Sequence, residues 1–146
     1  MLRQIFRKDC NNNMSKSAIY TALSTPTSVS SDAIIPLGAT IRRFGCNISQ
    51  DGNTISIKGR GYFLVNISIT AAPAAVGTVT ATLNKDGVPV TGATASSSVS
   101  TAANPTALPI VAIVRNACEC DSSILSLALS GEASTVQNVA VSVVKL

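Results

Sequence analysis

The stretch that decides the fold, residues 59–91, reads GRGYFLVNISITAAPAAVGTVTATLNKDGVPVT. Its first half alternates apolar residues at 63, 65, 67 and 69 with polar residues at 66, 68 and 70, which predicts a strand with one buried face. A second alternation, from Thr78 to Leu83, sets valine, alanine and leucine opposite three threonines. Asn84 to Gly87 then supplies residues that tolerate positive φ, and so predicts a hairpin turn into a third strand.

The rest of the chain, from Ser17 onward, continues the β pattern. Apolar or alternating runs are separated by Gly, Pro, Asn and Ser residues at the spacing typical of β-sandwiches. The predicted fold is therefore all-β, an antiparallel two-sheet jelly-roll sandwich. We expect residues 24–31 to be a surface connection and residues 91–105 to be either a loop or a weak outer strand. Further strands are expected at 18–23, 33–44 (broken by Pro36 and Gly38), 46–49, 54–57, 108–114, 124–130 and 139–144.

The composition favours a single domain that associates with other protein chains. With 146 residues, the chain is long enough to bury a core without metal or disulfides. Hydrophobic residues make up 46% of it and charged residues only 12%, and its mean hydropathy is +0.37. No apolar run approaches the roughly 18 residues that span a bilayer. We therefore expect the excess apolar surface to be buried between subunits and not in a membrane.

Residues 1–16 are predicted to be a short basic arm, separate from the domain at 17–146. The arm holds +3 of the chain's net charge of +4, and its three apolar residues share one side of a helical turn. The pattern fits a docking peptide, although an ordinary solvated terminus carries such charges too. The residues concerned are Leu2, Ile5 and Phe6 on the apolar side, and Arg3, Arg7, Lys8 and Lys16 among the basic ones.

The four cysteines, at positions 10, 46, 118 and 120, have neither the spacing of a redox centre nor histidine partners for zinc, since the chain contains no histidine. On a strand, Cys118 and Cys120 would point to the same face, a poor geometry for a mutual disulfide. We therefore expect free thiols in a reducing compartment, with Cys46 and one of the pair buried. No segment typical of a signal peptide is present, so we expect assembly in the cytoplasm of a cell.

The last predicted strand carries the pattern of an interface. Val139, Val141 and Val143 would fill the core, while the reverse face stays mostly small or apolar. A strand that lines an axis between subunits would need such residues, and one self-complementary strand per subunit can build a closed ring. An ordinary central strand covered by a loop has the same pattern. The residues expected at the interface are Ala140, Ser142, Val144 and Leu146.

Two motifs, Gly59-Arg60-Gly61-Tyr62-Phe63 and Asn84-Lys85-Asp86-Gly87-Val88-Pro89-Val90, carry a family resemblance. In them the chain resembles the tumour-necrosis-factor-like and complement-globular-head superfamily, and bacterial and phage members in particular. The resemblance covers residues 17–146 and implies a jelly roll that forms a tight homotrimer, with its terminal strand near the threefold axis. No acidic cluster matches the loop residues with which animal relatives bind calcium, so no metal or other cofactor is expected.

A short arm on a trimeric knob is similar to the capsid decoration proteins and head-fibre proteins of tailed bacteriophages. The resemblance therefore implies a structural virion protein on the capsid surface, assembled in the bacterial host cytoplasm. Its partner would be the major capsid protein or another virion protein, docked by the arm. The residues expected to dock are Leu2, Arg3, Ile5, Phe6, Arg7 and Lys8.

Other functions fit less of the sequence. A host-surface adhesin or tail-fibre knob would bind a glycan or protein through exposed loops such as 91–105. A bacterial spore-surface protein would follow a collagen-like stalk, which this sequence does not contain. Without histidine, paired carboxylates or a phosphate-binding loop, no enzyme is expected. Nucleic-acid binding would rest on a small cluster that the rim of a sheet explains better, namely Arg42, Arg43, Lys58 and Arg60 near Phe44 and Tyr62.

Overall fold

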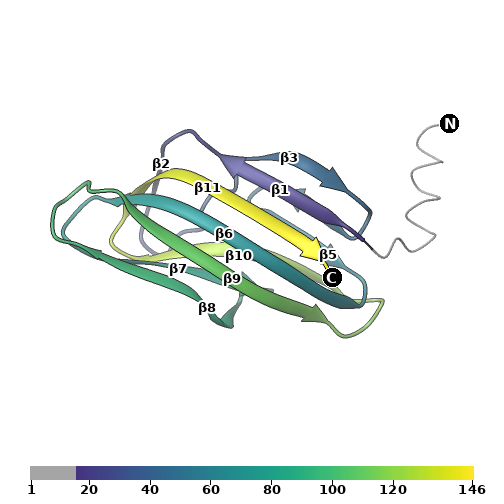
Figure 1. The fold of residues 1–146 in the computed structure, drawn as a ribbon. Helices are drawn as coiled ribbons and strands as arrows, with labels where there is room; N and C mark the ends of the chain where they lie inside the picture. The colour runs from purple at the N-terminus through teal and green to yellow at the C-terminus, as the bar shows by residue number, and fades with distance from the viewer. Residues whose placement is uncertain (1–15) are drawn as a thin grey trace.

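The computed structural model describes residues 16–146, which fold into strands joined by turns and loops (Figure 1). In this part of the chain, no helix is long and apolar enough to cross a membrane. The strands are β1 (Ala18–Leu23), β2 (Thr27–Val29), β3 (Ala39–Phe44), β4 (Ile48–Asp51), β5 (Thr54–Lys58), β6 (Gly61–Pro73), β7 (Gly77–Lys85), β8 (Val88–Val99), β9 (Thr106–Asn116), β10 (Ser122–Gly131) and β11 (Ser134–Lys145).

The strands form two antiparallel sheets that stack as layers. The six-stranded sheet has the order β3-β1-β11-β6-β9, with β2 paired to the start of β11, and the five-stranded sheet has the order β4-β5-β10-β7-β8. Neighbours within each sheet are mostly distant in sequence, as crossovers between the two layers of a jelly roll require. The predicted fold class, an all-β two-sheet jelly roll, is confirmed.

The core lies where strand alternation predicts it. On β6, Phe63, Val65, Ile67 and Ile69 are at most 4% exposed, and on β11 the four buried valines are at most 3% exposed. These side chains join one buried cluster with Leu125, Leu127 and Leu129 of β10 in the opposite sheet. Burial of each large aliphatic side chain stabilises the fold by roughly 1.5–3 kcal/mol, so the alternating strands hold the two layers together.

The hairpin between β7 and β8 has the predicted turn chemistry. Asp86 and Gly87 have φ angles of 53° and 81°, the left-handed conformations that a tight hairpin needs. The Asp86 N–H donates to the carbonyl oxygen of Ile124 at 2.8 Å, and the Asp86 carboxylate accepts from the Ile124 N–H at 2.9 Å. The turn is therefore pinned to β10 and serves the fold.

Two segments contain more strand than the sequence predicts. The expected surface connection at 24–31 includes β2, whose three residues pair with Ser134–Val136 of β11. Of the two alternatives for 91–105, the outer strand is confirmed as far as Val99, because β8 pairs with β7 along this length. Both pairings join segments distant in sequence or built from small polar residues, which local apolar periodicity does not reveal.

Both ends of the described chain lie at one end of the sandwich. The Lys145 N–H donates to the Ser17 carbonyl oxygen at 2.9 Å, and Figure 1 shows the C-terminus on the side where the described chain begins. The other end is built from loops that contact one another. There, the Ala74 N–H donates to Ala133 and the Ala103 N–H donates to Pro73, at 2.8 and 2.7 Å.

Candidate assembly surface and cysteine turn

The outward side of the six-stranded sheet carries a row of apolar residues that crosses five strands. Strand pairing fixes this row, because residues directly opposite each other point to the same side of a sheet. In order across the sheet, from β3 through β1, β11 and β6 to β9, the row consists of Phe44, Ala18, Val144, Leu64 and Ile113.

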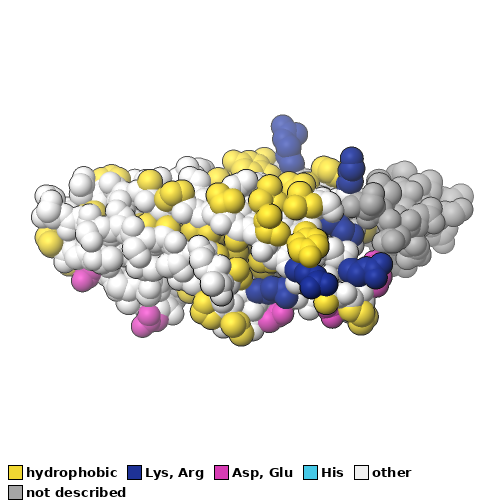
Figure 2. All heavy atoms as spheres, turned by 60° about the horizontal axis from the view of Figure 1, so that its bottom comes forward, with side chains coloured by type: hydrophobic (Ala, Val, Ile, Leu, Met, Phe, Trp, Pro, Cys, Tyr) yellow, Lys and Arg dark blue, Asp and Glu magenta, His cyan; other side chains and the backbone are white. Residues whose placement is uncertain are grey.

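Solvent reaches much of this surface. Phe44 is 58% exposed, Ile113 57% and Val144 39%, and the next row adds Tyr20 and Val111 at 40% and 65%. Figure 2 shows hydrophobic side chains gathered with Lys and Arg in the half of the molecule next to the grey residues. We call this surface the outer apolar face, defined by Tyr20, Phe44, Leu64, Val111, Ile113 and Val144.

The four residues predicted at a trimer interface lie on or beside the outer apolar face. Ala140 and Ser142 are half-buried and line a shallow groove together with Tyr20, Asn66 and Ser68. Val144 and Leu146 are exposed, the latter at 65%. β11 is a central strand of its sheet, and the exposure of Val144 means that no described loop covers this end of it.

Sequence reasoning missed the parts of the face that come from other strands. The local sequence did indicate the exposure of Val111 and Ile113. Residues 108–114 are apolar at both odd and even positions, whereas a strand with one buried face needs apolar residues at only every second position. Tyr20 and Phe44 had no such local signal. Tyr20 joins the face because β1 pairs with β11, which is about a hundred residues away in sequence, and Phe44 joins it because β3 pairs with β1. The sequence of each segment alone does not contain these pairings.

Over β7, β8 and the end of β10, the outward side of the five-stranded sheet has the opposite chemistry. Thr78 and Ser98 form a hydroxyl pair at 2.9 Å across β7 and β8, and Thr80 and Ser96 form another at 2.8 Å. Neighbouring positions on β7, β8 and β10 also carry hydroxyls. We call this surface the hydroxyl face, defined by Thr78, Thr80, Thr82, Thr94, Ser96, Ser98 and Ser130.

The basic residues at the end of the sandwich where the described chain begins make different contacts. Arg43 Nε donates to the Ile48 carbonyl oxygen at 2.7 Å and so ties β3 of one sheet to β4 of the other. Arg42 pairs with Tyr20 across β1 and β3, at the edge of the outer apolar face. The guanidinium of Arg115 lies over the Tyr62 ring, 5.7 Å from its centroid. A role at the sheet rim thus accounts for Arg43 without a nucleic-acid ligand.

The cysteines differ from the prediction. β9 ends at Asn116 and β10 begins at Ser122, so Cys118 and Cys120 lie in a turn, where strand alternation does not apply. Both are exposed and are joined in a disulfide, with Cα atoms 5.3 Å apart, within the usual range for a disulfide. Cys46 is half-buried and is also disulfide-bonded. The expectation of free, partly buried thiols is wrong for these three residues, and the reducing compartment inferred from it loses its support.

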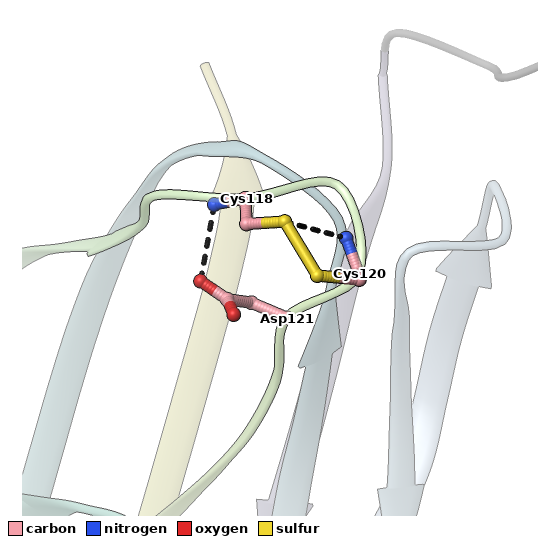
Figure 3. Close-up of side chains that lie close together, drawn as sticks. All are labelled: Cys118, Cys120 and Asp121. Atoms are coloured by element: carbon pink, nitrogen blue, oxygen red, sulfur yellow. Dashed lines mark hydrogen bonds between the residues drawn. A yellow bond between two sulfur atoms is a disulfide. The ribbon is translucent and has the colours of Figure 1, made fainter.

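The turn that holds the two cysteines, residues 117–121, is organised by hydrogen bonds (Figure 3). Asp121 Oδ2 accepts from the backbone N–H groups of Ala117 and Cys118 at 3.1 and 3.0 Å, and the Cys120 N–H is directed at the Cys118 sulfur at 3.3 Å. Buried Asn116 and Ser123 bond to each other at 3.0 Å beneath it. We call residues 117–121 the cysteine turn.

The predicted docking residues Leu2, Arg3, Ile5, Phe6, Arg7 and Lys8 lie outside the described residues. Of the arm, the structure describes Lys16, which is exposed and directly precedes buried Ser17. The Ser17 hydroxyl accepts from the Asn47 N–H at 3.1 Å, so the chain is held firmly at the point where the domain begins.

No protein-family model matches the chain, and a search of curated proteins finds no match. Among solved structures, the Eiger TNF of S. frugiperda has 14% identity and a TM-score of 0.67, over 90% of this chain and 91% of that one. The globular domain of zebrafish complement 1qA has 9% identity and a TM-score of 0.63, over 90% and 96%. Vertex protein P5 of phage PRD1 has 13% identity and a TM-score of 0.56, over 88% and 72%.

At such low identity, these likenesses concern the fold. Together with the two antiparallel sheets, they show that the described chain has a jelly-roll fold like that of tumour-necrosis-factor and complement 1q domains. On this fold the chain carries two unlike outward surfaces, the outer apolar face and the hydroxyl face, and a disulfide-bonded cysteine turn.

Proposed function

We propose that this chain is a structural protein of a bacteriophage virion, a homotrimeric knob that residues 1–16 hold on the capsid surface. The observation that carries the proposal is the outer apolar face, which the described chain leaves open to solvent. Contiguous exposed apolar surface is uncommon on monomeric soluble proteins and marks sites of association. A partner that covers this face would bury Phe44, Val111 and Ile113.

Other copies of the same chain are the partners that this proposal assigns to the face. Closed symmetric assemblies bury the same patch on every subunit, so one apolar face per chain is sufficient. The groove at Ala140 and Ser142 gives a neighbouring subunit room to approach the centre of the sheet. The resemblance to the tumour-necrosis-factor-like superfamily supports three copies. In this arrangement, Val144 and Leu146 contribute apolar contacts near the axis.

The arm supplies the attachment in this proposal. Its apolar residues Leu2, Ile5 and Phe6 would bind the major capsid protein or another virion protein, and Arg3, Arg7 and Lys8 would meet acidic groups there. The domain and the arm join at the end of the sandwich that also holds the C-terminus. The likeness in fold to a phage vertex protein supports a virion location.

The trimer is tested by size-exclusion chromatography with light scattering on the full chain. We expect a mass of three chains of 14.9 kDa. A monomer at tens of micromolar would contradict the assembly, whatever the result for the arm.

Docking is tested by mixing the full chain with capsids that lack it, and comparing a variant without residues 1–13. We expect the full chain to sediment with the capsids and the shortened chain to remain in solution as a trimer. A variant with Arg3, Arg7 and Lys8 changed to Gln keeps the apolar residues of the arm, so its capsid binding shows how much the basic residues contribute. Equal binding by the full and shortened chains would contradict docking through the arm.

A host-surface adhesin is the second candidate. It is favoured by the loop end of the sandwich, which lies opposite the termini and where residues 100–105 are all exposed. Binding of the shortened trimer to host cells, lost when residues 101–104 are replaced by Gly and Ser, would favour this function over decoration alone.

A further inference from the structure

We propose that the cysteine turn, once its disulfide is reduced, binds a soft divalent cation such as Zn²⁺ through Cys118, Cys120 and Asp121. The three side chains come from one short turn, and their candidate ligand atoms all lie within 4.8 Å of one another. Thiolate sulfur selects zinc and similar cations over calcium and magnesium. Two thiolates and one carboxylate supply three of the four ligands of a tetrahedral zinc site, with water as the fourth.

The carboxylate ligand is already oriented. Asp121 Oδ2 is held by the two backbone N–H groups of Ala117 and Cys118, and no hydrogen bond is recorded to Oδ1 within the described chain. The Asp121 N–H donates to the Cys118 carbonyl oxygen at 3.0 Å, and the Asp121 carbonyl oxygen accepts from the Gly59 N–H at 2.9 Å. Such bonds fix the direction of a ligand and preserve its position when the metal leaves.

The sulfur ligands are also favourably placed. Cys118 and Cys120 are exposed, so both a reductant and a metal ion reach them from solvent. The Cys120 N–H, directed at the Cys118 sulfur at 3.3 Å, stabilises negative charge on that sulfur. Beneath the turn, the Ser123 hydroxyl donates to Asn116 Oδ1 at 3.0 Å and Asn116 Nδ2 donates to the Ile57 carbonyl oxygen of β5 at 3.3 Å, and neither bond involves a cysteine.

Reduction is a two-electron step for which a dithiol, or two molecules of a glutathione-type thiol, is the reductant. The reductant becomes a disulfide, the bond between the two cysteine sulfurs breaks, and each sulfur gains a proton. Metal binding then releases these protons as the thiols become thiolates. The disulfide closes a loop of only a few residues, so its loss costs less stability than the loss of a disulfide that spans a long loop. The exposed position favours exchange with external thiols.

The test uses the full chain, reduced with a phosphine and separated from it without oxygen, and titrated with Cd²⁺ as a spectroscopic substitute for Zn²⁺. We expect the ultraviolet sulfur-to-metal charge-transfer band to saturate at one ion per chain. Zn²⁺ should then displace Cd²⁺ and remove the band. The oxidised protein should show no band.

Matched variants identify the ligands. Changing both Cys118 and Cys120 to Ser should abolish the band, while Cys46→Ser should preserve it. Asp121→Asn should weaken binding at least tenfold, whereas Glu119→Gln should change it much less. Circular dichroism establishes that each variant retains the β-sandwich. The proposal is wrong if the reduced protein shows no band, or if the double serine variant binds Cd²⁺ as tightly as the parent chain.

Discussion

The two sheets turn unlike faces outward although both are built from alternating strands. On β6, β9 and β11, outward positions hold Leu64, Ile113 and Val144, whereas on β7 and β8 they hold threonine and serine. The inward positions are apolar in both sheets. The difference therefore has no role in closing the core, and it is the reason for assigning the proposed assembly to the six-stranded sheet. The hydroxyl face serves as the comparison: it is an outward sheet surface of the same domain that carries polar residues and for which no partner is expected.

The largest effect is expected when a charged residue is introduced on one face or the other, which tests whether only the apolar face associates. Ile113→Asp should weaken assembly at least about a hundredfold, because a carboxylate would be desolvated in an apolar interface. Thr80→Asp is the matched control on the hydroxyl face and should leave the assembly intact. Light scattering over a concentration series measures both. Loss of assembly in both variants, or in neither, would contradict the assignment of the faces.

Substitutions at two adjacent valines of β11 distinguish an effect on folding from an effect on association. Val143 is fully buried, so Val143→Ala should lower the free energy of unfolding by about 2 kcal/mol. Val144→Ala should change the stability of the isolated subunit by no more than about 0.5 kcal/mol, yet weaken assembly. Urea unfolding at dilutions that dissociate the assembly measures the first effect. Equal destabilisation by both changes would argue against a solvent-facing Val144.

The groove at the centre of the face offers a steric test. Ser142→Gln would fill it, and we expect assembly to weaken about tenfold, or about 1.4 kcal/mol. The same change at Ser96 on the hydroxyl face should have no effect on assembly. Unchanged assembly of Ser142→Gln would mean that no neighbour approaches this part of β11.

The smallest effect is expected on the hydroxyl face itself. Thr80→Val removes one side of its hydroxyl pair with Ser96. Because these groups are near solvent and can bond to water instead, we expect a loss of no more than about 1 kcal/mol. A double-mutant cycle with Ser96→Ala, measured by urea unfolding, gives the coupling energy. Coupling well above this value would mean that the face is shielded from water.

The sequence predicts those parts of the fold that depend on local pattern. Alternation placed Phe63 and Val139 in the core, and positive-φ residues placed the turn at Asp86 and Gly87. It did not predict that Tyr20 and Phe44 lie on the same face as Val144, because this depends on long-range register. The cysteine disulfide was missed for a related reason. The prediction assumed that Cys118 and Cys120 lie on a strand and point to the same face. Because β9 ends at Asn116, they lie in a turn, where this alternation does not hold.

The position of both ends of the described chain at one end of the sandwich has a practical consequence for protein engineering. Residues 101–104, in the exposed loop between β8 and β9, lie at the far end, away from any attachment through residues 1–16. A foreign peptide inserted there would be carried at the tip of the domain, clear of the apolar face and of the cysteine turn. If residues 1–16 anchor the domain as proposed, it offers a scaffold for display in which cargo and anchor are attached at opposite ends of the sandwich.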